Sequence, residues 1–191
     1  ITCFELAGSY HHYHCPIART CIIQNPKNIN NKLLCTIQMI HMAMNKALCA
    51  AIAGNTAEDI YNAYNEIVMQ VDNLGKQSRI GYSFGIGYPP DWGEKTLSCR
   101  PNDKTILKNG MCLHWIAGCG DGFDYEYSEA IVIQDEYPEL LCKTPRGLFI
   151  KENHNDSIMY LDSELALCSY NLICNSLDLN SSEFELKYIK G

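Results

Sequence analysis

The sequence predicts an α+β domain, from the order of its elements and the spacing of its apolar residues. Residues 1–24 are typical of β-strands, two helical segments follow, and strands are expected again at 111–116 and 130–134. Strands therefore flank a pair of helices instead of alternating with them, which disfavours an alternating parallel sheet. The 191 residues, 47% hydrophobic and 19% charged, suit one globular domain with a real core.

Apolar spacing and capping residues predict the individual elements. Residues 31–53 should form a helix because apolar side chains recur at intervals of three and four. Thr56 should cap a second helix, with Asp59 three residues later in the spacing of a capping box. Residues 73–103 are rich in glycine and proline and are expected to be irregular, and residues 157–168 fit a further helix.

Charge and hydropathy exclude several classes of partner. The net charge of −7 argues against nucleic acid, which requires a basic footprint. No apolar run reaches the ~20 residues that a membrane helix needs, so no membrane partner is expected. The glycines at 81–87 and 118–122 do not fit a dinucleotide loop or a P-loop, since neither group lies between a strand and the start of a helix.

Cysteine usage and the first residues bear on compartment and completeness. The eleven cysteines are odd in number, diffusely spaced and without a Cys-x-x-Cys pair, which favours buried free thiols in a reducing, cytoplasmic setting. The chain opens at Ile1 in a strand-like segment without a signal peptide. We therefore expect it to start inside a domain.

Three segments carry a family resemblance. They are FELAGSYHHYHCPIART (4–20), GYSFGIGYPPDWGEKTLSCRPNDKTILKNGM (81–111) and SEAIVIQDEYPELL (128–141). In this order they resemble the catalytic domain shared by prolidase, aminopeptidase P, methionine aminopeptidase and creatinase. The run from 81 to 94 is most similar to the ectoine hydrolase group. The resemblance implies a pita-bread fold, a curved antiparallel sheet backed by helices, over a partial domain at 1–150, and it leaves a C-terminal tail at 151–191 unmatched.

The same resemblance can be tested against metal chemistry. Peptidases of this superfamily hold two metal ions with two Asp, one His and two Glu, and the motifs place Glu5, Pro16, Tyr82, Ile116 and Ser128 at those positions. Proline and isoleucine side chains cannot bind a metal, and tyrosine and serine are poor substitutes for histidine and glutamate. We therefore expect no metal site and no cofactor. Creatinase keeps the fold and works without metal.

Metal-free hydrolysis in this superfamily implies attack on an amidine-type carbon, as in creatine or ectoine. A base that titrates near neutrality points to histidine. His14 and His114 each lie two residues from a ligand position, so on a strand each should share its face. Tyr82 could donate a hydrogen bond to the leaving nitrogen, and Glu129 is the carboxylate nearest the last ligand position. These four are the catalytic candidates, and ordinary packing remains an alternative for each.

Substrate-binding candidates follow from charge. Carboxylates suit a cationic substrate, and arginine suits a substrate carboxylate. The candidates are Glu5, Glu126, Arg100, Asp91 and Trp92. Solvated strand ends and turns are the alternative for the acidic residues.

The sequence leaves three functions open. The first is a metal-independent C–N hydrolase similar to ectoine hydrolase, acting on a small molecule and expected to form a homodimer. The second is a peptidase-like enzyme for Xaa-Pro peptides, and the third is a truncated, non-catalytic pita-bread domain. The creatinase-type catalytic histidine lies before the strand where this chain begins, so we expect an incomplete active site in these 191 residues.

Overall fold

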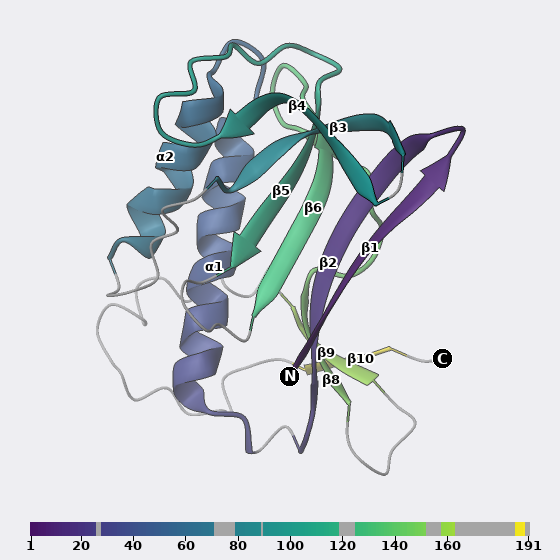
Figure 1. Cartoon of the computed structure of the whole chain (residues 1–191). Coiled ribbons are helices and arrows are strands. Elements are labelled where there is room, and N and C mark those ends of the chain that lie inside the picture. The colour runs from purple at the N-terminus through teal and green to yellow at the C-terminus, as the bar shows by residue number, and fades with distance from the viewer. Residues whose placement is uncertain are drawn as a thin grey trace.

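The computed structural model describes residues 1–25, 28–70, 79–88, 90–118, 125–151, 158–162 and 186–189. Two helices and ten strands lie in this part of the chain (Figure 1). In chain order they are β1 (Thr2–Tyr10), β2 (Tyr13–Ile23), α1 (Asn31–Ala50), α2 (Ala57–Val68), β3 (Gly81–Tyr88), β4 (Asp91–Cys99), β5 (Cys112–Gly118), β6 (Glu126–Val132), β7 (Glu139–Leu140), β8 (Gly147–Lys151), β9 (Ile158–Asp162) and β10 (Leu186–Ile189).

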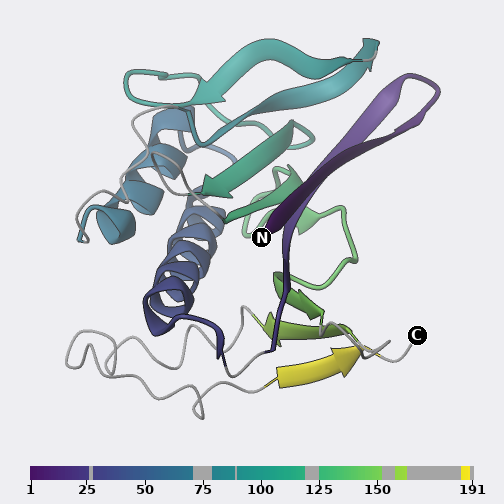
Figure 2. The ribbon, with the colours of Figure 1, turned by 60° about the horizontal axis from the view of Figure 1, so that its bottom comes forward.

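The described strands form one curled sheet. Its order is β10-β9-β8-β2-β3-β5-β6-β7, with β1 paired to β2 and β4 paired to β3. Strand β3 pairs with β5 at residues 81–83 and then with β2 at Ile86, so the sheet bends where β3 changes partner. All pairings are antiparallel except β2 with β8. The β1–β2 hairpin stands away from the helices (Figure 2). These features confirm the predicted α+β class.

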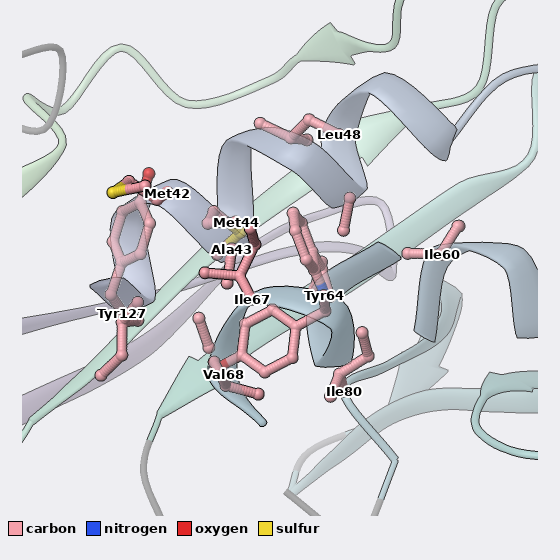
Figure 3. Packing of buried hydrophobic residues seen from close by; sticks show 14 of the residues in the cluster. Met42, Ala43, Met44, Leu48, Ile60, Tyr64, Ile67, Val68, Ile80 and Tyr127 are labelled. Atoms are coloured by element: carbon pink, nitrogen blue, oxygen red, sulfur yellow. The ribbon is translucent and has the colours of Figure 1, made fainter. Parts of the chain in front are cut away.

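Both helices cover one side of the sheet. Helix α2 begins with the predicted capping box, in which the Thr56 hydroxyl accepts from the Asp59 N–H and the Asp59 carboxylate accepts from the Thr56 N–H. Tyr64 of α2 meets Trp115 of β5 edge to face, at 6.1 Å between ring centroids. Figure 3 shows Tyr64 packed among apolar side chains from α1, α2 and the sheet. The main core therefore lies between the helix pair and this side of the sheet.

Period-two alternation gives β5 and β6 two distinct faces. Trp115, Tyr127 and Glu129 lie on the side covered by α1 and α2, which we call the helix face. His114 and Ser128 lie on the opposite side, together with Tyr82 of β3, which pairs with His114. We call this side the site face.

The prediction that residues 73–103 are irregular is wrong for most of the described residues in this range. Strands β3 and β4 form a hairpin there, and the glycines permit close approach inside it instead of marking loops. A Cβ on Gly85 would collide with the Glu94 carboxylate, and one on Gly87 would lie 2.9 Å from the Asp91 carbonyl oxygen.

Two other boundaries differ from expectation. Helix α1 ends at Ala50, before Ile52 forms an isolated bridge with Gln134. The expected helix at 157–168 is wrong over β9, because residues 158–162 pair with β8 as a strand, and residues 163–168 lie outside the described part. Strand β8 spans the expected domain boundary at residue 150, which stays a prediction. No helix in the described ranges is long and apolar enough to cross a membrane.

Candidate active site

A chain of three hydrogen-bonded side chains occupies the site face. The Tyr82 hydroxyl lies 2.9 Å from His114 Nδ1, and His114 Nε2 lies 2.8 Å from Ser128 Oγ. Their positions follow from strand register, because Tyr82 pairs with His114 in β3–β5 and Ile116 pairs with Ser128 in β5–β6. The resemblance had placed Tyr82 and Ser128 at metal-ligand positions. Here they sit at the two ends of an imidazole bridge.

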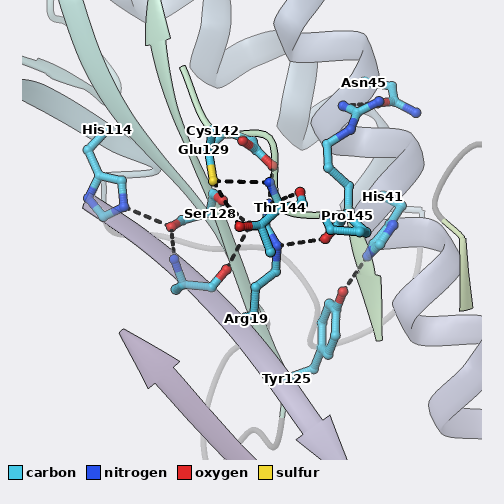
Figure 4. A network of polar contacts seen from close by, with 12 residues as sticks. Arg19, His41, Asn45, His114, Tyr125, Ser128, Glu129, Cys142, Thr144 and Pro145 are labelled. Carbon is cyan, nitrogen blue, oxygen red and sulfur yellow. Dashed lines mark hydrogen bonds and ion pairs between the residues drawn. The ribbon is translucent and has the colours of Figure 1, made fainter. Parts of the chain in front are cut away.

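Strand β2 anchors the Ser128 end of this chain. The Ala18 N–H donates to Ser128 Oγ at 2.6 Å, and the same oxygen takes part in the His114–Ser128 bond drawn in Figure 4. Nearby, the Thr20 hydroxyl donates to the Glu126 carbonyl at 2.7 Å and accepts from the Glu126 N–H at 2.9 Å. Side-chain hydroxyls thus join β2 to β6, between which the described residues form no ladder. Ser128 is both a bridge between strands and a partner of His114.

The Tyr82 end is held by three other residues. The Trp92 indole N–H donates to the Tyr82 oxygen at 2.9 Å, and the guanidinium carbon of Arg79 lies 4.3 Å from the centroid of the Tyr82 ring. A Cβ on Gly93 would touch the ring edge at 3.4 Å, so glycine lets the ring lie against β4. Burial raises the pKa of Tyr82. Tyr82 is therefore a neutral phenol at physiological pH.

The hydrogen bonds among Tyr82, His114 and Ser128 leave one donor, the Tyr82 hydroxyl, available to a ligand. Ser128 Oγ accepts from Ala18, so its own proton can be donated to His114 Nε2. His114 protonated on Nδ1 then donates to the Tyr82 oxygen, which also accepts from Trp92. In this arrangement the Tyr82 O–H can be donated to a bound molecule.

Burial decides which of these groups can meet a substrate. His114 and Ser128 are 0% exposed, whereas Tyr82 retains 9% exposure. We expected His114 to face a pocket directly. It lies on the predicted face, but it is fully buried and both ring nitrogens bond to protein groups. His114 can therefore act only through Tyr82 or Ser128.

The expected acidic residues differ in burial and in their distance from Tyr82. Glu5 pairs with Ala18 across the β1–β2 hairpin, is exposed, and its charge contributes to the raised pKa of Tyr82. Glu126 is half-buried, two residues before Ser128 on the same side of β6. Asp91 is exposed, and its pKa is lowered mainly by the hydrogen bond from the Gly93 N–H. Glu5 and Asp91 therefore lie near enough to act on Tyr82, whereas Glu126 lies four residues along β6 from the residue in register with it.

The donor set does not fit a two-metal centre. Of the five positions that the resemblance assigns to ligands, only Glu5 carries a carboxylate. The Tyr82 hydroxyl and the Ser128 hydroxyl are both committed to His114. Within the described ranges, no three His, Cys, Asp or Glu side chains lie close enough together to hold an ion.

Glu129 differs from its expected placement. It lies on the helix face, 0% exposed, with Oε1 2.7 Å from Arg19 Nη2 (Figure 4). Burial raises the pKa of Glu129, and the guanidinium groups of Arg19 and Arg146 oppose that shift. The reason is period two: Glu129 adjoins Ser128 in β6, so the two side chains point to opposite faces. Glu129 cannot share a substrate with Tyr82 from this position.

Arg19 joins Glu129 to several backbone carbonyl groups, including that of Ser128. Its guanidinium also donates to the carbonyl oxygens of Ser128 at 2.5 Å, Ala18 at 2.9 Å, Pro145 at 3.0 Å and Thr144 at 3.1 Å. These bonds fix the backbone of Ser128 against β2. Arg19 thus has a structural role.

His14 and Arg100 lie away from the Tyr82 hydroxyl. His14 is buried, and its Nε2 donates to the Gly87 carbonyl oxygen at 3.1 Å, so it joins the two hairpins. Arg100 follows β4 and lies beside Asp103, whose carboxylate accepts from Ser98 and Thr105. The arginine near Tyr82 is instead Arg79, which sequence reasoning missed. Its position three residues before Tyr82 was the available signal.

Comparison with known proteins identifies the family of this chain. It belongs to metallopeptidase family M24, which matches residues 1–137. It is 36% identical over 151 residues to the ectoine hydrolase of Halomonas elongata, an alignment that covers 78% of this chain and 37% of that protein. The chain therefore spans little more than a third of that relative.

Solved structures agree on the fold. A dipeptidase from Pyrococcus horikoshii OT3 superposes with a TM-score of 0.67 at 22% identity, covering 78% of this chain and 40% of the other. A prolidase from Pyrococcus furiosus gives 0.63 at 23%, with 75% and 41% covered. The curled antiparallel sheet and its two helices are therefore part of a pita-bread fold, as the resemblance implied.

Proposed function

We propose that the protein containing this chain is a hydrolase that cleaves a C–N bond in a small amidine-type substrate without a resident metal ion. The observation that carries the proposal is the Tyr82–His114–Ser128 chain, which takes positions that the resemblance assigns to metal ligands. Membership of a hydrolase family and the likeness to ectoine hydrolase support the choice of substrate class.

Amidine hydrolysis needs a proton for the departing nitrogen, and Tyr82 is suited to supply it. Burial keeps the phenol protonated and available as an acid, and the Nδ1–H of His114 can stabilise the negative charge that develops on its oxygen as the proton leaves. Trp92 donates to the same oxygen, so the developing charge would receive two N–H groups. Tyr82 is thus the proposed general acid, and His114 and Trp92 are the residues that position it.

A cationic amidine also needs a negative environment. Glu5 and Glu126 belong to the site face, and Glu5 is close enough for its charge to affect the pKa of Tyr82. We assign them to holding the cation, which would be drawn toward the phenol. The group that activates water is not assigned among the residues described.

The test compares two substrates under two metal conditions. The 191-residue chain and the longest open reading frame that contains it are incubated with ectoine in excess chelator, and ring opening is followed by mass spectrometry. In parallel, an Xaa-Pro dipeptide is offered after addition of Mn²⁺ or Co²⁺. Tyr82→Phe is the matched variant, because it keeps the ring and removes only the hydroxyl.

The expected result is ring opening under chelation that Tyr82→Phe abolishes. Dipeptide cleavage that requires added metal would instead identify a metallopeptidase and overturn the proposal. A folded protein that turns over neither substrate, and binds neither, would favour a non-catalytic pita-bread domain.

A further inference from the structure

The Arg79 side chain is an unassigned cation at the candidate site. Its guanidinium lies over the Tyr82 ring, with 4.3 Å between the guanidinium carbon and the ring centroid. Arg79 is exposed, in contrast to the buried Arg19. Stacking on an aromatic face orients a guanidinium while leaving the N–H groups at its edge able to donate.

Those N–H groups are not used by the part of the chain that the structure describes. No hydrogen bond or ion pair links Arg79 to any described residue. Asp91, whose pKa the Arg79 charge affects, accepts from the Gly93 N–H at 3.0 Å and lies 3.3 Å from the Lys95 ammonium group. The charge of Arg79 lowers the pKa of Asp91, yet Lys95 provides the ion pair.

The local charge pattern has two poles around one phenol. Arg79 contacts the Tyr82 ring, while Glu5 lies near the same residue from the β1–β2 hairpin. A ligand bound at the hydroxyl would therefore meet a cation on one side and a carboxylate nearby. Guanidinium groups bind carboxylates through two parallel N–H donors, which gives orientation as well as affinity.

We propose that Arg79 binds a carboxylate of the substrate, so that the site selects a zwitterion in which this carboxylate lies beside the cationic amidine. This inference rests on the proposed function and narrows its substrate class. It also gives Arg79, a cation, a role at a site otherwise suited to cationic ligands. Ectoine, a cyclic amidine that carries a carboxylate, satisfies both poles.

The experiment separates carboxylate recognition from general support of Tyr82. Ectoine and its carboxamide, which lacks the negative charge, are compared as ligands and substrates of the wild type, Arg79→Met and Arg79→Lys. Arg100→Met is the matched control, since Arg100 is also exposed but lies beside Asp103. Binding is measured by calorimetry and turnover by mass spectrometry, with circular dichroism to confirm folding.

Arg79→Met should weaken binding and raise KM for ectoine by roughly 10- to 100-fold, the range for a lost hydrogen bond to a charged group. It should leave the carboxamide unchanged. Arg79→Lys should recover part of the loss because it keeps the charge without the planar fork. Equal losses for both compounds would show that Arg79 only supports Tyr82 and would overturn the inference.

The two proposals fail in different ways. Binding of ectoine that depends on Arg79, without turnover by any form, would disprove the hydrolase and keep the carboxylate site. Turnover of ectoine that Arg79→Met leaves unchanged would keep the hydrolase and disprove the role of Arg79. Absence of ectoine binding to the folded wild type would overturn both.

Discussion

The two faces of β5 and β6 carry different kinds of polar network. On the site face, hydrogen bonds link Tyr82, His114 and Ser128, and Tyr82 at one end retains exposure. On the helix face, Arg19 and Glu129 form a buried ion pair, and Arg19 also binds four backbone carbonyls. The helix-face network is buried, with Glu129 Oε2 and the Tyr127 hydroxyl lacking a hydrogen-bond partner among the described residues, whereas the site-face chain of side chains has an exposed end that can donate to a ligand.

The difference shows how burial distinguishes a structural polar group from a candidate functional one. The Arg19 guanidinium donates to Glu129 and to backbone carbonyls, and the Tyr127 ring lies 4.9 Å from it. The His41 ring of α1 stacks on the same ring, with 4.7 Å between centroids, so the helix covers this network. A buried ion pair is expensive to break, and a ligand cannot reach it without opening the core. The two networks should therefore respond differently to mutation.

Tyr82→Phe should have the largest effect, and it should fall on activity. Loss of a general acid reduces kcat by about 10²- to 10⁴-fold. Because His114 and Trp92 each lose a partner, the free energy of unfolding should also fall, by about 1–3 kcal/mol. Steady-state kinetics and urea denaturation measure the two. A kcat within twofold of the wild type would remove Tyr82 from the mechanism.

Glu129→Ala should have the next largest effect, and it should fall on stability. It leaves the Arg19 charge buried without its carboxylate partner, which typically costs about 3–5 kcal/mol. Urea denaturation measures the loss. The double variant Arg19→Met, Glu129→Met should be more stable than Glu129→Ala, because no unpaired charge remains. If Glu129→Ala kept its stability and lost turnover instead, the contrast between the two faces would be wrong.

His114→Gln tests whether the histidine acts through Tyr82. Glutamine can donate and accept but cannot bridge Tyr82 and Ser128 with the geometry of a ring. We expect kcat to fall about tenfold or more with KM unchanged, and stability to fall by about 1–3 kcal/mol. A rise in KM at constant kcat would indicate that His114 contacts substrate, contrary to its burial.

Much of this arrangement follows from the sequence, and the failures have physical causes. Spacing of two from the ligand positions placed His114 on the same strand face as Tyr82 and Ser128, and Thr56 with Asp59 predicted the cap of α2. The same two-residue alternation along a strand also implies that the side chains of Glu129 and Ser128 point to opposite faces. Nearness to a ligand position in the sequence was the wrong criterion for that residue.

Other features depend on contacts that no local pattern encodes. The β3–β4 hairpin was missed because glycines that permit close packing in strands resemble glycines of loops. The burial of His114 depends on packing around the β3–β5 pairing, and the importance of Arg79 depends on its position over a ring. The sequence alone can identify residues such as His114 as candidates, but it does not give their burial.

Substitution of Cys99 should have the smallest effect on stability, and it tests the comparison of the two faces at a single position. It lies on β4 opposite Gly81, next to the Tyr82–Ser98 pair, and it is 1% exposed. Burial raises the pKa of the Cys99 thiol from 9.0 to about 12. The folded state therefore favours the neutral thiol, and the stability that this gives is fully present below pH 9 and is lost as pH rises toward 12.

At neutral pH, Cys99→Ala should cost about 1 kcal/mol, because it removes one small buried group. Between pH 9 and about 12 the wild type should lose stability faster than the variant, so the difference should shrink and then reverse. Urea denaturation across this range measures it. Cys99 shares the helix face and its core with Trp115. A constant difference would therefore mean that the Cys99 thiol reaches solvent and that the helix face is less tightly sealed here than its burial indicates.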